Sequence, residues 1–368
     1  MDRRNFLKAA AFTTAGAVAG PTLLERAGSM LASPAFAASG GTLFGASAQE
    51  YGGKSREQLI QYLEGLAGGS FDTVQNRFGW TTSLVNSYSK WIVQTGHTPI
   101  LSWSTHGGGD VPWAEIAKGA HDARILAEAA KIAAEGWRAY LIFHKEPEDE
   151  PNLGSAADYR NAHDRVYGIF REAGATNVSF VANLMAATYK GRNGGASTWL
   201  PPRFDVVGVD GYNRNKSGAW RSFDSIFQPA LEVARDRSKP LYVIESGCVE
   251  GTPGRKGDWF REAAATAATW PELIGISYNH ESGTGNYRVD TSPTAIAGFH
   301  DLAQHAAIGA RSGGGEGSGG GGGGGGGTDT CEVTREKLAT RRDQVRELRR
   351  KLLRQRRKTR RLRKRLER

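Results

Sequence analysis

The sequence of 368 residues is poor in cysteine, with only Cys248 and Cys331, which excludes a disulfide framework and a zinc site built from several cysteines. Three motifs of common catalytic machinery are also missing: H-E-x-x-H of zinc proteases, G-x-S-x-G of serine hydrolases, and G-x-G-x-x-G after the first predicted strand. The histidines do not show the spacing of metal ligands. We therefore expect neither a metal ion nor another cofactor.

A long hydrophobic run is absent as well. The apolar stretch over 9–20 is shorter than the ~20 residues that a membrane-spanning helix needs. Arg3 and Arg4 precede it and an A-x-A site ending at Ala37 follows it, a pattern that resembles the twin-arginine signal peptide of bacteria. We expect residues 1–37 to be removed after Ala37 and the protein to be exported folded and secreted; the alternative is an ordinary amphipathic first helix.

The positive charge is unevenly distributed along the chain. Residues 328–368 hold 18 Lys and Arg against 6 Asp and Glu, whereas the net charge of the whole chain is +10. Residues 38–327 carry −4, so the bulk of the protein is mildly acidic and the basic character belongs to a tail. The hydrophobic content of 39% is enough for a sizeable core and argues against a chain that is disordered throughout.

The tail follows a segment, 312–327, that contains thirteen glycines and is predicted to be a flexible linker. Residues 328–368 are rich in helix-forming Arg, Leu, Lys and Glu, with no Gly or Pro, so we predict a basic α-helical tail. We expect it to bind an anionic cell-wall polymer or a membrane surface; the alternative is a solvated tail without a partner. Export makes nucleic acid an unphysiological partner. We expect a monomer, with weak self-association through the tail, or an intermolecular disulfide of Cys331, as the alternative.

Between these ends, apolar runs alternate with Ala-rich helical stretches. Strands are predicted over 43–46, 71–78, 99–103, 139–144, 178–182, 206–210, 241–245 and 273–278. Helices are predicted over 55–67, 114–119, 123–134, 156–174, 223–237 and 259–269. Repeated strand–helix units of this number predict an α/β fold, a (β/α)8 TIM barrel over 38–311. A doubly wound open sheet is the alternative, and the missing glycine turn disfavours it.

In such a barrel, functional side chains lie at the carboxyl ends of the strands. The fourth predicted strand runs into Glu146 and the seventh ends at Glu245. Two carboxylates that face each other across the mouth are what a retaining glycosidase needs, one as nucleophile and one as proton donor. The alternative for each carboxylate is a solvated loop residue.

Several segments in this order resemble glycoside hydrolase family 26, a family in the clan of barrel glycosidases with acids on strands 4 and 7. The segments are Ile116 to Asp122, Asp158 to Val178, Asp205 to Tyr212, and Lys239 to Gly247. The resemblance spans most of 41–311. It implies a β-mannanase-like hydrolase of β-linked polysaccharide.

The resemblance also implies roles for individual residues. Glu146 is expected to be the general acid/base and Glu245 the nucleophile, with Tyr212 hydrogen-bonded to the nucleophile. His144 is expected beside the acid and Asp210 among the substrate-binding residues. Because the acid needs a raised pKa and the nucleophile a carboxylate kept charged, neighbouring groups must act on the two in opposite directions.

Lys145 departs from the family pattern, since the β-mannanases usually have His directly before the acid. Its side chain either points at Glu146, where it would lower the pKa of that carboxyl, or points away. The departure leaves an alternative open, a catalytically impaired carbohydrate-binding barrel that the tail tethers to an anionic cell surface. A third reading is a cationic adhesion protein with the barrel as a spacer.

Aromatic residues near the strand ends are candidates for stacking on the apolar faces of sugar rings. The candidates are Trp103, Trp113, Tyr212, Tyr278 and Tyr287. Packing in the core is the alternative for each of them. The sequence does not specify which β-glycan is bound.

Overall fold

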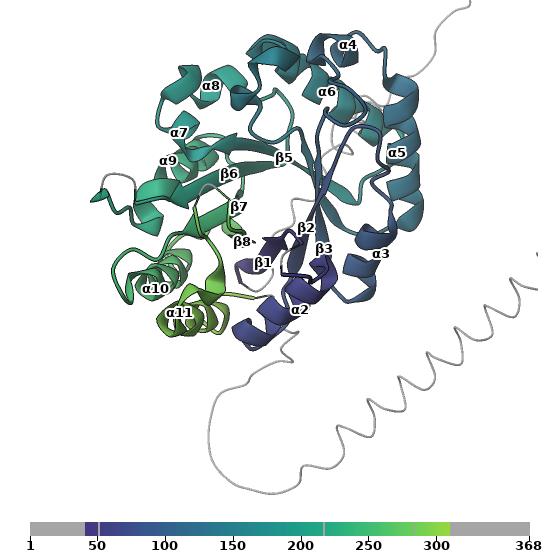
Figure 1. Cartoon of the computed structure of the whole chain (residues 1–368). Helices are drawn as coiled ribbons and strands as arrows, with labels where there is room; N and C mark the ends of the chain where they lie inside the picture. Colours follow the sequence, from purple (N-terminus) through teal and green to yellow (C-terminus); the bar gives the residue numbers. More distant parts are fainter. Residues whose placement is uncertain (1–40, 51, 216–217, 284, 310–368) are drawn as a thin grey trace, which may run out of the picture. The chain divides into compact units, whose positions relative to one another are not determined.

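Figure 1 shows the computed structural model, which describes residues 41–309 except residues 51, 216, 217 and 284. Eight parallel strands follow one another in chain order around a closed barrel, and the last strand pairs with the first. They are β1 (Leu43–Ala48), β2 (Thr73–Phe78), β3 (Thr98–Trp103), β4 (Ala139–Phe143), β5 (Val178–Met185), β6 (Val206–Asn213), β7 (Leu241–Cys248) and β8 (Leu273–His280). The predicted (β/α)8 TIM barrel is confirmed.

All eight predicted strands exist, but β1, β5, β6, β7 and β8 continue past their predicted ends. The added residues include Asn183, Tyr212 and Asn279, which are polar positions at the mouth of the barrel. The apolar pattern stops earlier than the strand because the inward-facing positions change from core to site.

Helices surround the barrel (Figure 1). The longer ones are α2 (Arg56–Ala67), α3 (Ser87–Gln94), α5 (Asp122–Glu135), α6 (Ala156–Glu172), α9 (Phe223–Asp236), α10 (Arg255–Ala267) and α11 (Pro293–Ala303). Shorter ones are α4 (Trp113–Ala117), α7 (Ala186–Tyr189) and α8 (Ala196–Trp199). The six predicted helices are present with shifted ends, while α3, α7, α8 and α11 were not predicted.

Serine caps determine where two of the predicted helices begin. The Ser55 hydroxyl accepts from the backbone N–H of Gln58, and the Gln58 side chain accepts from the backbone N–H of Ser55, which closes a capping box on α2. Ser155 and Asp158 form the same arrangement on α6. Each cap satisfies N–H groups that would otherwise be unpaired and contributes about 1 kcal/mol.

One layer of apolar side chains packs between the strands and the surrounding helices, and a second layer fills the inside of the barrel. In the inner layer, Tyr140 and Tyr242 meet edge to face with ring centroids 5.2 Å apart, and Tyr242 shares a hydrogen bond of 2.7 Å with Thr73. Gly275 has no side chain because a Cβ there would lie 2.4 Å from the Tyr242 ring. These tyrosines come from the second positions of their strands, so they fill the amino-terminal half and leave the carboxyl ends as the mouth.

The predicted signal peptide (1–37), linker (312–327), basic tail (328–368) and Cys331 lie outside the described residues. Cys248 is buried. Among the described helices, none has the length and apolar character required to cross a membrane.

Candidate active site

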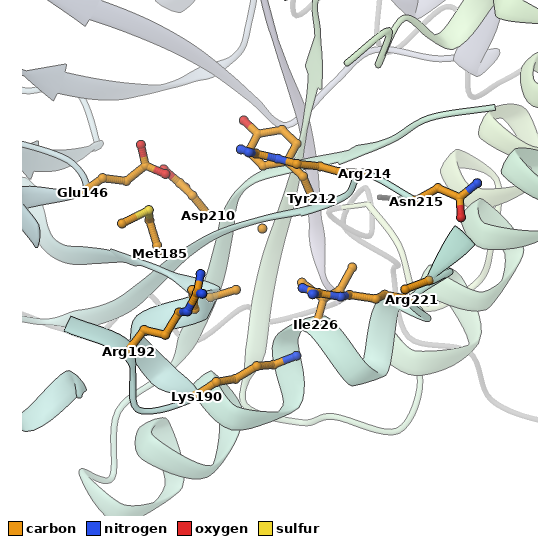
Figure 2. A pocket seen from close by; sticks show the side chains of 14 residues that line it. Glu146, Met185, Lys190, Arg192, Asp210, Tyr212, Arg214, Asn215, Arg221 and Ile226 are labelled. Carbon is orange, nitrogen blue, oxygen red and sulfur yellow. The ribbon is translucent and has the colours of Figure 1, made fainter. Parts of the chain in front are cut away.

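The carboxyl ends of β2, β4, β6 and β7 bring charged and polar side chains together at the barrel mouth. Glu245 lies on β7 in register with Asp210 on β6, next to an irregularity in the strand pairing. Glu146 comes three residues after β4, and Figure 2 shows its carboxyl near Asp210 and Tyr212. The two predicted carboxylates thus reach the same mouth.

Glu245 is surrounded by four donors. The hydroxyl of Tyr212 donates to one carboxylate oxygen at 2.6 Å, while Lys145 and Arg77 both donate to the other at 2.9 Å. Gln75 adds a longer bond of 3.3 Å. Burial alone would raise the pKa of this carboxyl, which is only 3% exposed, but Lys145 and Arg77 lower the pKa to about 2. Glu245 is therefore ionised at neutral pH.

Glu146 has a different environment. Its side chain is 25% exposed, and its backbone N–H donates to the carbonyl oxygen of Asn183 at 3.1 Å. Burial raises the pKa of the Glu146 carboxyl, the charge of Glu245 raises it further, and Lys145 opposes both. The net shift is upward, so Glu146 holds its proton more readily than Glu245 does.

Lys145 points into the site, which resolves the two orientations that the sequence left open. Its ammonium lies 2.9 Å from Glu245, 3.6 Å from Glu146 and 3.8 Å from Asp210. The three carboxylates raise the pKa of Lys145 against the effect of burial, so the residue stays charged. Because Glu146 Oε2 and Glu245 Oε1 both contact one nitrogen, these two oxygens are at most about 6.5 Å apart.

Asp210 is fully enclosed except where it meets the pocket described below. One of its oxygens accepts a hydrogen bond of 2.8 Å from the amide of Asn183. Burial raises the pKa of the Asp210 carboxyl well above its ordinary value, and the nearby charge of Glu245 adds to this. Asp210 therefore adds less negative charge to the site than its residue type suggests.

The backbone leading to Glu146 is strained. His144 and Glu146 have φ angles of 50° and 49°, in the left-handed region that non-glycine residues rarely adopt. Such residues cost on the order of 1–3 kcal/mol each and persist where the surroundings impose them. Here the strain directs both Lys145 and Glu146 toward the mouth.

His144 holds this turn, and only 2% of the residue is exposed; its predicted contact with substrate stays a prediction. The ring is buried and packs edge-on against Trp113 at 5.2 Å. Its Nδ1 accepts from the backbone N–H of Thr105 at 3.1 Å, and burial lowers the pKa of the ring to about 3. A neutral, anchored imidazole fixes the backbone on which Glu146 stands.

His106, His144 and Glu150 form the group nearest to a metal-binding arrangement among residues 41–309, with side-chain ligand atoms within 4.8 Å of one another. The chemistry of the group does not suit a metal. Because Nδ1 of His144 accepts from an amide, the ring proton of neutral His144 sits on Nε2, and neither nitrogen has a free lone pair. His106 bridges Asp110 at 2.7 Å and Glu150 at 3.3 Å, so the group links two loops.

Four of the five predicted sugar-stacking residues are at most 1% exposed, so their rings offer no open face to a sugar: Trp103, Trp113, Tyr278 and Tyr287. Trp103 is 0% exposed and stacks on Trp80 at 4.4 Å, beneath the helices. Tyr278 is enclosed by helix residues and donates to the carbonyl oxygen of Tyr287 at 2.6 Å. The ring of Tyr287 is itself buried, against Tyr212 at 4.7 Å. The outward positions of a strand face the helices, which is why proximity to a strand end misled the prediction.

Three functional residues were missed by sequence reasoning: Gln75, Arg77 and Asn279. The amide of Asn279 donates to the Tyr212 hydroxyl at 3.0 Å, while its oxygen accepts from Arg77 at 3.3 Å. Asn279 therefore orients two of the groups that hold Glu245. The sequence pattern that could have indicated them is a polar residue at every second position of a strand. Gln75 and Arg77 follow this pattern in β2, and side chains at alternate positions of a barrel strand point into the barrel.

A pocket of about 290 Å³ opens beside Glu146 and Asp210. Figure 2 shows the side chains around it. It is lined by Glu146, Met185, Ala186, Ala187, Lys190, Arg192, Asp210, Gly211, Tyr212, Arg214, Asn215, Ala219, Arg221 and Ile226. Of the predicted substrate-binding residues, Asp210 and Tyr212 thus lie where a ligand could contact them.

Fold and site together place the molecule among (β/α)8 barrels whose mouth holds a pair of carboxylates. Solved structures of the same fold include a GH26 β-mannanase from Bacteroides ovatus, with a TM-score of 0.52, 16% identity, and coverage of 74% of this chain and 91% of that one. The GH26 domain of an endo-β-mannanase/endo-β-glucanase from Prevotella bryantii gives a TM-score of 0.51 at 10% identity, covering 73% and 90% of the two chains. At these identities the likeness is one of fold.

The sequence is also similar to Endoglucanase H of Acetivibrio thermocellus, with 26% identity over 287 residues. The match covers 71% of this chain and 30% of that protein, so the chain spans less than one third of its length. No family model matches the chain.

Proposed function

We propose that the barrel is a glycoside hydrolase that cleaves the backbone of a β-linked polysaccharide with retention of configuration, as an endo-β-glycanase such as a β-mannanase does. The observation that carries the proposal is the pair of carboxyls at the mouth, which share the Lys145 ammonium and whose pKa values are shifted in opposite directions. The pKa of Glu245 is lowered to about 2, mainly by Lys145 and Arg77 acting against burial, while burial raises the pKa of Glu146. One fold thus holds a nucleophile and an acid side by side.

In the first step, Glu146 donates its proton to the glycosidic oxygen while a Glu245 oxygen attacks the anomeric carbon, and the sugar–oxygen bond breaks. The product is a glycosyl ester of Glu245 with a free leaving-group hydroxyl. In the second step, Glu146, now ionised, removes a proton from water as the water attacks the same carbon. The ester bond breaks, and both carboxyls return to their starting states.

The spacing of the carboxylates supports retention over inversion. Retaining enzymes hold the two groups ~5–5.5 Å apart, whereas inverting enzymes keep them ~6.5–9.5 Å apart to admit a water. The shared contact with Lys145 keeps Glu146 Oε2 and Glu245 Oε1 within about 6.5 Å of each other. The whole retaining range lies within this limit, whereas only the shortest inverting separations do.

The relatives support the same reaction class. Endoglucanase H is named for cleaving a glucan, and the fold neighbours are named as β-mannanases. Within this chain, Tyr212 supplies the hydroxyl that the family resemblance predicts next to the nucleophile. Secretion by the twin-arginine route and tethering by the basic tail belong to the proposal as well, since both rest on the sequence of segments outside 41–309.

The proposal is tested by measuring reducing ends released from mannan, mixed-linkage glucan and xylan by the full chain. We expect turnover of at least one polymer, lost in Glu245→Gln and unchanged in Glu172→Gln, which alters an exposed glutamate on α6. Glu245→Gln keeps the shape of the side chain, so unchanged folding is checked by thermal unfolding. Polysaccharide binding without turnover at any pH would contradict the proposal and favour a carbohydrate-binding barrel.

A further inference from the structure

Four basic side chains line the pocket beside Glu146: Lys190, Arg192, Arg214 and Arg221. Figure 2 shows Arg192, Lys190 and Arg221 along one edge of the pocket, with Glu146 and Asp210 across from them. The four residues come from the loops that follow β5 and β6, and all four are exposed. The wall of the pocket is therefore strongly cationic.

Within residues 41–309, none of the four forms an ion pair with an acidic side chain. Lys190 donates to the backbone carbonyl of Ser225 at 2.5 Å, and Arg214 lies over the Tyr212 ring at 5.5 Å. Other exposed arginines of the barrel do pair: Arg203 contacts Asp164 at 2.5 Å and Arg235 contacts Glu272 at 3.0 Å. The acidic residues of the pocket lining are Glu146 and Asp210, so four basic side chains outnumber two acidic ones.

Clustered like charges disfavour one another, and the effect is visible at Lys190. Burial lowers the pKa of its ammonium, and the nearby guanidinium of Arg221 lowers it further. An anion that bound between these groups would remove the repulsion. Guanidinium groups suit this purpose because they donate two parallel hydrogen bonds to a carboxylate, sulfate or phosphate.

We propose that this pocket is a subsite for an acidic sugar residue, so that the substrate is a β-glycan that carries carboxylate, sulfate or phosphate groups. The inference rests on the proposed hydrolase function, because it places the acidic sugar next to the bond that Glu146 would protonate. A neutral mannan or glucan has no group that would balance the four positive charges. The hydroxyls of such a polymer need hydrogen-bond partners but not unpaired cations.

The catalytic carboxylates do not prevent an anion from binding here. The charge of Glu245 is offset by Arg77 and Lys145, each 2.9 Å away. Asp210, which lines the pocket, has a raised pKa because of its burial, so it contributes little negative charge. Burial also raises the pKa of Glu146, the other carboxyl in the lining, so the four basic residues remain the main charged groups of the pocket.

Soluble β-1,4-glucans with different substituents provide the test: hydroxyethyl, carboxymethyl, sulfate and phosphate derivatives of one backbone, together with β-1,4-mannan and β-1,4-polymannuronate. The full chain is used, and both cleavage and binding are measured. For at least one acidic polymer we expect a kcat/KM about tenfold or more above that of its neutral counterpart, falling as salt rises. Which derivative is preferred distinguishes carboxylate, sulfate and phosphate as the recognised group.

Three single variants distinguish the effect of the pocket on polymer binding and cleavage from that of other basic residues. Arg192→Gln and Arg221→Gln should each reduce the preference for acidic over neutral polymer, measured as the ratio of kcat/KM or of affinity, about tenfold. Arg237→Gln removes an exposed charge that caps α9 and should change neither. All three keep the basic tail, so any binding of acidic polymer by the tail is the same in each and cancels in the comparison.

Equal or faster cleavage of neutral polymer, with no effect of either pocket variant, would overturn the inference and leave the hydrolase intact. Failure to cleave any polymer, combined with weaker binding of acidic polymer by Arg192→Gln and Arg221→Gln, would uphold the acidic subsite and count against hydrolysis. No cleavage and equal binding by all variants would overturn both.

Discussion

The two sides of the barrel mouth carry the same chemical group in opposite settings. On the β7 side, Glu245 is buried and contacts Tyr212, Lys145 and Arg77 at 2.6–2.9 Å. On the β4 side, Glu146 sits on a strained turn, a quarter exposed, with one cation at 3.6 Å. Burial raises the pKa of Glu146, whereas the closer and more numerous positive groups around Glu245 lower its pKa, and this difference would allow one carboxyl to attack while the other donates a proton.

The largest effect is expected when either carboxyl is removed, and the leaving group of the substrate should distinguish the two variants. Glu245→Ala should reduce kcat by about 10⁴-fold or more on every substrate, since no nucleophile remains. Glu146→Ala should lose about 10²–10⁴-fold on polysaccharide but far less on a 2,4-dinitrophenyl glycoside, whose leaving group needs no proton. Steady-state kinetics on both substrates provide the measurement. Equal losses for the two variants on the aryl glycoside would remove the distinction between the two sides.

A second effect should appear when Lys145, whose ammonium contacts both Glu146 and Glu245, is replaced. Lys145 lowers the pKa of Glu245, which must be ionised, and also opposes the rise in the pKa of Glu146, which must be protonated. In Lys145→Met both pKa values should rise, so both limbs of the kcat/KM–pH profile should move to higher pH. We expect kcat/KM near the optimum to fall about tenfold or more. If both limbs stayed at the pH values of the unmodified protein, Lys145 would not act on the carboxyls.

The hydroxyl of Tyr212 should have a smaller influence. Tyr212→Phe removes one hydrogen bond to a charged group, worth roughly 1.5–3 kcal/mol, and should lower kcat/KM on the order of tenfold while moving the acidic limb upward. Tyr278→Phe is the matched control, because its hydroxyl bonds to the backbone of Tyr287 away from the carboxylates. It should reduce thermal stability without moving either limb, and a shift of the acidic limb in the control would refute the assignment.

The smallest effect on catalysis is expected from Trp103, the residue that the sequence suggested as a sugar platform. Trp103→Ala should lower the free energy of unfolding by about 3–5 kcal/mol, because it opens a cavity next to Trp80. KM for polysaccharide should not change below the unfolding temperature. A large rise in KM with unchanged stability would restore the discarded role.

The sequence was sufficient for the barrel because apolar runs alternate with Ala-rich helical stretches along 41–311. It also placed Glu146 and Glu245, since each follows such a run directly. It did not place Arg77, which bonds Glu245 across the barrel, or Asn279, which bonds Arg77 and Tyr212, because these contacts arise only when the barrel closes. Contacts that form only when the barrel closes join residues far apart in the chain, so no local sequence pattern predicts them.

The burial of individual aromatic side chains could not be predicted from the local sequence pattern either. Trp103 and Tyr278 lie near strand ends, as predicted for sugar-binding aromatics, but their side chains face the helices. Short loops after β5 and β6 carry the basic residues of the pocket, and nothing in their order indicates that Arg192 and Arg221 line one cavity. Such arrangements follow from the path of each loop across the barrel mouth.

The stereochemistry of the first product tests the account most directly. Proton NMR spectra recorded in the first minutes of hydrolysis of a β-linked oligosaccharide resolve the two anomers before they interconvert. The paired carboxylates of Glu146 and Glu245, both in contact with Lys145, predict that the β-anomer forms first. Initial formation of the α-anomer would show that a water attacks directly, and would contradict Glu245 as the nucleophile.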